Sequence, residues 1–143
     1  MTSLPVWRLI DHTGDIAFAV EAKTWASLLE TATAAVGEVI LGGAAGEAEE
    51  EREVGVEGED REDVLVAWLT EAVVQFEEDG FLSRRARVDV ATEREARGVL
   101  VGRRLDLDVE APDRVIKAVT YHDLHVVEGR AGAPWKATVV LDL

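Results

Sequence analysis

The spacing of apolar residues changes once along this chain, and that change constrains the fold more than any other feature. Between Asp60 and Gly80 apolar residues recur every third or fourth position, which predicts an amphipathic helix. Asp60 can accept hydrogen bonds from the first turn of this helix, and Gly80 can adopt the left-handed conformation that ends it. From Phe81 onward the spacing falls to two, which predicts strands over 86–93, 97–107, 115–127 and 135–143.

The N-terminal half contains a second helical pattern. An apolar stripe follows Thr24, a suitable N-cap, and ends before the glycine pair at 42–43. The residues at 16–20 alternate as a buried strand does. Between the two helices, a stretch rich in Gly, Ala and Glu is typical of a solvated linker around 49–51, and the valines at 54–56 indicate a short strand.

These elements together predict the fold class. We expect an α+β fold, in which two amphipathic helices pack on one face of a mainly antiparallel, mixed sheet to form two layers. With 143 residues, the chain is expected to form a single domain over 1–143. A chain of this size is long enough to bury about 70% of the surface that its unfolded form exposes.

The composition argues against several classes of function. The 15 Lys and Arg residues against 29 Asp and Glu residues give a formal net charge of −14, which repels phosphate backbones and anionic membranes. Strong direct nucleic-acid binding is therefore not expected. The absence of cysteine excludes disulfides, thiolate metal sites and a cysteine nucleophile. We find no pattern of a signal peptide, a membrane span or a glycine-rich phosphate loop, so we expect a cytoplasmic protein.

Polar groups gather at two places where a strand begins or ends. The first is DHTGD, from Asp11 to Asp15, which opens the first strand. It can be a simple turn, or it can offer carboxylate and carbonyl oxygens to Mg²⁺ or Ca²⁺. The second is Asp142 with Leu143, after the apolar strand at 137–141. These two residues are either solvated or hold two anionic groups close enough to attract a divalent cation. The residues alone leave both alternatives open.

A third polar stretch is KAVTYHDLHV at 117–126. If it alternates as one strand, Asp123 and His125 share a face with Lys117, and His122 lies on the other face among small or apolar residues. We therefore expect a buried, hydrogen-bonded His122. No serine or cysteine nucleophile lies nearby to complete a triad with the Asp–His pair, and the three histidines of the chain lack the spacing of a zinc protease.

Four segments of the chain together resemble the archease family. DHTGDIAFAVEAKTWASLLETA is similar to the family's His-Thr-Ala-Asp turn, strand and helix, and EDVLVAWLTEAVVQFEEDGFL is similar to its second helix. IKAVTYHDLHV and the final VVLDL are similar to its closing segments, with order and spacing kept. The resemblance implies an accessory protein rather than an enzyme. Archeases assist the GTP-dependent RNA ligase that joins exon halves in tRNA splicing, by promoting its guanylylation and its multiple turnover.

The resemblance also implies a metal site. In the family a divalent cation is bound by the Asp of the opening turn and by the last two residues, which correspond here to Asp15, Asp142 and Leu143, the last through main-chain oxygens. For these groups to meet, the final strand must lie beside the opening strand with its end at the turn. We expect Ca²⁺ or Mg²⁺. Further candidates, for outer contacts to the ion or for contacts to a partner, are Asp11, His12, Lys117 and His122.

Two questions stay open at the level of the sequence. An alternative function is a metal-dependent phosphohydrolase or nucleotidyl enzyme that uses Asp15, Asp142 and His122. In addition, Gly102 is followed by Arg103 and a loop without histidine, where the family often has Gly-Glu and a histidine-containing loop. Any contact that this loop makes with the ligase is therefore expected to have changed. The sequence does not set the oligomeric state.

Overall fold

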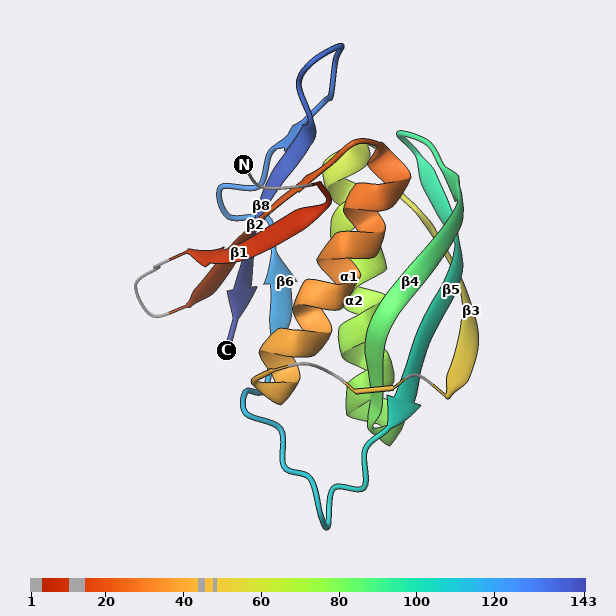
Figure 1. The fold of residues 1–143 in the computed structure, drawn as a ribbon, viewed down its shortest axis with the longest axis vertical. Helices are drawn as coiled ribbons and strands as arrows, with labels where there is room; N and C mark the ends of the chain where they lie inside the picture. Colours follow the sequence, from red (N-terminus) through yellow and green to blue (C-terminus); the bar gives the residue numbers. More distant parts are fainter. Residues whose placement is uncertain (1–3, 11–14, 44–45, 48) are drawn as a thin grey trace.

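Figure 1 shows the computed structural model of the chain, which describes residues 4–10, 15–43, 46–47 and 49–143. Two helices, α1 (Trp25–Leu41) and α2 (Arg61–Asp79), pack against each other and run in the same direction. The strands, in chain order, are β1 (Val6–Ile10), β2 (Ile16–Ala22), β3 (Glu50–Glu57), β4 (Phe81–Ala91), β5 (Glu95–Arg104), β6 (Ala118–Thr120), β7 (Val126–Val127) and β8 (Trp135–Asp142).

Both helices begin and end where their local chemistry predicts. Thr24 and Asp60 are the N-caps, and their side chains accept hydrogen bonds from amides three residues further on, at 3.0 and 2.8 Å. Gly42 and Gly80 end the helices with φ of 85° and 76°, in the left-handed region. The two predicted helices are thus confirmed. Neither of them, in the part of the chain that the structure describes, is long and apolar enough to cross a membrane.

The strands form two sheets. Sheet A has the order β1-β2-β8-β6, with β7 also paired to β8, and sheet B has the order β3-β5-β4; all these pairings are antiparallel. The α+β class is confirmed, but the arrangement differs from the single sheet that we expected, because the helices lie between two sheets (Figure 1). The reason lies in α1, which buries ten of its 17 residues. Ten buried residues occupy more than one apolar stripe of the helix, so α1 must pack against other elements on both of its sides.

α1 and β4 approach each other closely at Gly37. A Cβ atom on Gly37 would lie 2.0 Å from the carbonyl oxygen of Ser83, so only glycine permits this contact. β4 has two register irregularities, between Ser83 and Arg85 and between Val88 and Val90. Irregularities of this kind bend a strand, and β4 curves along the helix pair in Figure 1.

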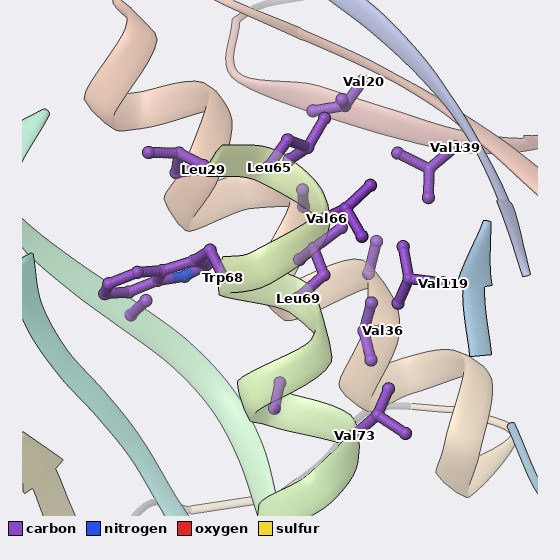
Figure 2. Close-up of a cluster of buried hydrophobic side chains, with 14 of the residues drawn as sticks. Val20, Leu29, Val36, Leu65, Val66, Trp68, Leu69, Val73, Val119 and Val139 are labelled. Atoms are coloured by element: carbon purple, nitrogen blue, oxygen red, sulfur yellow. The ribbon is translucent and has the colours of Figure 1, made fainter. Parts of the chain in front are cut away.

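The hydrophobic core fills both sides of α2, as Figure 2 shows. Leu65 and Leu69 point toward sheet A, where Val139 lies, whereas Trp68 points away from it, and all four side chains are fully buried. The indole Nε1–H of Trp68 donates to the hydroxyl of Thr33 on α1 at 2.9 Å. A buried tryptophan needs such a partner, so this bond fixes the relative position of the two helices.

The prediction of one continuous strand over 115–127 is wrong. The strand is interrupted between β6 and β7 by a turn in which the amide of Leu124 donates to the carbonyl of Tyr121 at 3.1 Å. Asp123 in this turn has a positive φ of 52°, which no regular strand allows. The faces that we assigned by alternation are therefore wrong after β6. Two smaller differences are β1, which was not predicted, and β3, which begins at Glu50 inside the expected linker.

Candidate functional site

The opening and final strands of the described chain lie side by side, as the expected site requires. β2 and β8 pair antiparallel, and the ladder begins with Ile16 opposite Leu141. Asp15 precedes Ile16 and Asp142 follows Leu141. Each acid thus lies one residue beyond the same pair, so both lie at the same end of sheet A.

β6 brings Lys117 to the same place. Ala118 pairs with Asp142, and the Lys117 amide donates to the main-chain carbonyl of Asp142 at 2.7 Å. Because side chains alternate along a strand, Asp142 points away from the core face that carries Leu141. Leu143 is partly buried and packs against the core. The end of sheet A therefore holds Asp15, Lys117, Asp142 and Leu143, which come from three separate stretches of the chain.

The donor groups at this end suit a hard cation. Mg²⁺ and Ca²⁺ prefer oxygen ligands, and the carboxylates of Asp15 and Asp142 with the main-chain oxygens of Leu143 are of that type. The carbonyl oxygen of Asp142 already accepts the Lys117 amide, which leaves its carboxylate as the main donor. Among the described residues no group of three or more His, Asp or Glu is placed to hold a metal. Asp11 and His12 lie outside the described residues, and the cation site stays a prediction.

His122 is not buried, so that expectation is wrong. It lies in the turn after β6 with its side chain 62% exposed, and its Nε2 atom is 3.1 Å from Oδ2 of Asp123. Asp123 thus pairs with His122 and not with His125, because the turn ends the alternation. β6 leads away from Asp142, because Ala118 pairs with Asp142 and Thr120 pairs with Val140, and His122 follows in the turn beyond Thr120. The structure does not bring His122 to Asp142.

The turn that carries His122 is held by the first turn of α2. The hydroxyl of Tyr121 donates to Oδ1 of Asp63 at 2.8 Å, and the amide of Val126 donates to Oε2 of Glu62 at 3.0 Å. The hydrogen bond to Asp63 raises the pKa of Tyr121. Sequence reasoning missed these contacts. A pairing of Tyr121 with Asp63 across 58 residues leaves no local pattern in the sequence.

A hollow on the surface of sheet B has a volume of about 700 Å³. Its two cations, Arg87 and Arg97, each lie near a carboxylate, at 3.5 Å from Glu51 and 3.1 Å from Glu95. These carboxylates offset the positive charge that an anion would need. We therefore do not take this hollow as the functional site.

The sequence comparisons agree with one another over nearly the whole chain. A family model described as the Archease protein family (MTH1598/TM1083) matches residues 7–143. A protein named archease from Methanopyrus kandleri is 38% identical over 140 residues, which cover 96% of this chain and 99% of that protein. Another protein named archease, from Methanosarcina barkeri, is 33% identical over 141 residues, which cover 96% and 95% of the two chains.

Two solved structures resemble the fold. The solution structure of protein 1598 from Methanobacterium thermoautotrophicum has a TM-score of 0.76 and 28% identity, and the match covers 96% of this chain and 98% of the other. A crystal structure from Thermotoga maritima, described as an archease and possible chaperone, has a TM-score of 0.57 and 23% identity over 94% of each chain. At that identity, the second likeness concerns the fold alone.

Proposed function

Because this chain belongs to the archease family, we propose that it is an accessory protein of the GTP-dependent RNA ligase that joins exon halves in tRNA splicing. In this role it promotes guanylylation of the ligase and its multiple turnover, in tRNA splicing or RNA repair in the cytoplasm, and it is not itself an enzyme. The observation that carries the proposal is the match of the family over residues 7–143.

The proposal includes a divalent cation, Ca²⁺ or Mg²⁺, at the end of sheet A. Asp15, Asp142 and the main-chain oxygens of Leu143 would hold it, and Asp11, His12 and Lys117 would lie around it or contact the partner. The support from the structure is the β2–β8 register, which puts Asp15 and Asp142 at one end of the sheet. When bound, the ion supplies positive charge that offsets the repulsion between the two carboxylates.

Electrostatics gives a physical route to partner recognition. The net charge of −14 complements the basic cleft with which a ligase binds RNA, and such complementarity speeds encounter. Docking then shifts the ligase toward the conformation that accepts GTP, provided that the accessory protein binds this conformation more tightly. Stimulation of the ligase should accordingly weaken as the salt concentration rises.

The test is a multiple-turnover RNA ligation assay with the cognate ligase, in which wild type, Asp15→Ala and Asp89→Ala are compared. Asp89→Ala removes the same charge from sheet B, where the side chain is 59% exposed, and is the matched control. We expect wild type and Asp89→Ala to stimulate multiple turnover and Asp15→Ala to stimulate it at least about tenfold less, because even the loss of a group that only supports a metal ligand costs about 10–100-fold. No stimulation by wild type would refute the accessory role. Equal stimulation by Asp15→Ala would refute the role of the cation.

A further inference from the structure

Exposed apolar side chains gather on the connection between β5 and β6, residues 105–117. Leu107, Val109 and Val115 are 57%, 79% and 64% exposed, and they are three of the seven large apolar side chains that the described residues leave open to solvent. In Figure 1 this connection, coloured cyan, hangs below the C-terminal ends of both helices. Single exposed apolar residues are ordinary, but a cluster on one segment indicates a contact surface.

A small apolar cavity opens between this connection and the helix ends. It has a volume of about 210 Å³, and its lining is apolar except for Glu77. The walls come from both helices and from the connection: Ile40, Val73, Phe76, Leu107, Val115 and Ile116. Pockets for drug-sized ligands measure roughly 300–1,000 Å³. The smaller cavity therefore suits one large apolar side chain better than a metabolite.

The connection is fixed at several points, so its apolar residues are held in place. The amide of Leu105 donates to the carbonyl of Gly80 at 2.9 Å, at the end of α2. The amide of Asp113 donates to the carbonyl of Ile40 at 2.8 Å, at the end of α1. Between these anchors, Glu110 accepts two hydrogen bonds of 2.9 and 2.8 Å from Arg103 on β5. The surface is thus formed before a partner arrives, which lowers the entropy cost of binding.

Acidic residues outnumber basic ones beside the walls of this cavity. Arg114, which precedes Val115, lies 3.8 Å from Oδ2 of Asp113. Glu77 lines the cavity, Asp106 and Asp108 flank Leu107, and none of them belongs to an ion pair among the described residues. Both helices also direct their C-termini, which carry partial negative charge, toward this end, and neither has a basic residue in its last turn. A partner that binds here must therefore bring positive charge.

We propose that this surface, formed by the cavity and by Leu107, Val109 and Val115 with their acidic rim, is a docking site for a partner protein. The recognised segment presents one apolar side chain of about the size of leucine or phenylalanine between Lys or Arg residues. The apolar side chain fills the cavity, and the basic residues meet Glu77, Asp106 and Asp108. We call it the end surface. This inference does not depend on the identity of the partner.

The end surface adjoins the end of sheet A. Val115 lies two residues before Lys117, whose amide binds the carbonyl of Asp142. A protein that docks at the end surface would thus also reach the strand ends that carry Asp142. The two surfaces can form one continuous interface, although each is testable alone.

The test is a titration of the isotope-labelled full chain with short peptides, followed by amide chemical shifts. The probe peptide has a central Leu between pairs of Lys residues; one control peptide has Glu in place of Lys, and another has Ser in place of Leu. We expect the probe to shift the amides of Phe76, Leu107 and Val115 saturably. Each control peptide should bind at least about tenfold more weakly than the probe, because one lacks the basic residues and the other lacks the apolar side chain.

Two variants with the same chemical change separate the end surface from the rest of the molecule. Val115→Asp should weaken probe binding by about tenfold, whereas Val127→Asp, at a side chain that is 45% exposed on β7, should leave it unchanged. Because both side chains are exposed, both variants should keep the wild-type chemical shifts away from the substituted residue. If Val115→Asp changes the spectrum more widely, Leu107→Ser is a milder second variant.

Three outcomes would overturn the inference. The first is the absence of saturable shifts at the end surface, and the second is equal binding of the probe and the Ser peptide, which would mean charge attraction alone. The third is a wild-type dimer in solution that Val115→Asp dissociates, since the occupant would then be a second copy of this chain. None of these experiments contains the ligase, so their failure and the failure of the proposed function are distinguishable.

Discussion

Replacement of Gly37 by alanine sets two effects of opposite sign against each other. In a helix interior alanine is favoured over glycine by about 1 kcal/mol. Here the added methyl group would lie 2.0 Å from the carbonyl oxygen of Ser83 and 3.2 Å from its carbonyl carbon, and both are main-chain atoms of β4 that cannot rotate away. To reach ordinary contact distances of about 3.5 Å, α1 and β4 must separate by more than about 1 Å.

The energetic balance follows from that displacement. Overpacking in a well-packed core costs about 1–3 kcal/mol, and a clash with main-chain atoms belongs at the upper limit. After subtraction of the gain of about 1 kcal/mol in helix propensity, Gly37→Ala should lower the free energy of unfolding by about 2 kcal/mol. An unfolding entropy of about 2.1 cal/mol/K per residue gives about 0.3 kcal/mol/K for 143 residues, so Tm should fall by about 7 °C.

Thermal and urea denaturation of the purified variant measure this loss. The control is Gly43→Ala, because a Cβ at Gly43 would meet no atom within 4 Å and the backbone there does not have positive φ. It should change the free energy of unfolding by less than about 0.5 kcal/mol. If Gly37→Ala is as stable as wild type or more stable, helix propensity dominates. The close contact between α1 and β4 would then be wrong.

Three further predictions concern the ion, the turn at Tyr121 and the enzyme alternative. At a Ca²⁺ concentration of about a hundred times Kd, the ion should stabilise wild type by about 2.7 kcal/mol; Asp142→Ala should lose this response in thermal melts, and an unchanged response would exclude Asp142 as a ligand. Because the pKa of Tyr121 is raised, the hydrogen bond to Asp63 stabilises the fold below pH 10.0, the ordinary value, and this stability is lost as the pH rises through the pKa of the folded state. Denaturation series across that range should therefore show a smaller alkaline loss for Tyr121→Phe than for wild type, and identical profiles would refute the contact. The purified chain without any ligase should hydrolyse neither nucleotides nor phosphoesters, whereas turnover that His122→Ala abolishes would support the enzyme.

The parts of the fold that sequence predicts well are those with local causes. Thr24 and Asp60 cap the helices because their side chains reach amides three residues on, and Gly42 and Gly80 end them because glycine tolerates positive φ. Both signals lie within a few residues and do not depend on what packs nearby. The helix bounds were therefore predictable to the residue.

The failures have causes that lie far away in the chain. Alternation from 115 to 127 predicts one strand, but the contacts of Tyr121 with Asp63 and of Val126 with Glu62 hold a turn instead. These contacts cross 58 and 64 residues, so no window of sequence contains them. The division of the strands into two sheets also depends on distant parts of the chain, because strands from different segments cover the two sides of α1.

The placement of Asp15 and Asp142 at one end of sheet A was expected for a different reason. Asp15 and Asp142 are 127 residues apart, and only the resemblance to the family joined them. The β2–β8 register then brought them to one end of sheet A without reference to any ion. The end surface had no such guide, because its walls combine Ile40 and Val73 with the distant Val115.

The connection between β5 and β6 explains why these features occur at the same end of the molecule. The connection donates a hydrogen bond from Leu105 to the carbonyl of Gly80 at the end of α2. It donates another from Asp113 to the carbonyl of Ile40 at the end of α1. Lys117, the residue before β6, donates its amide to the carbonyl of Asp142. One segment thus ties both helix ends to the strand that carries the candidate ligand. Because Arg103 holds this segment through Glu110, Arg103 positions the end surface. A change of partner could therefore be accommodated in the connection while the register of β2 and β8, and with it the candidate cation site, stays the same.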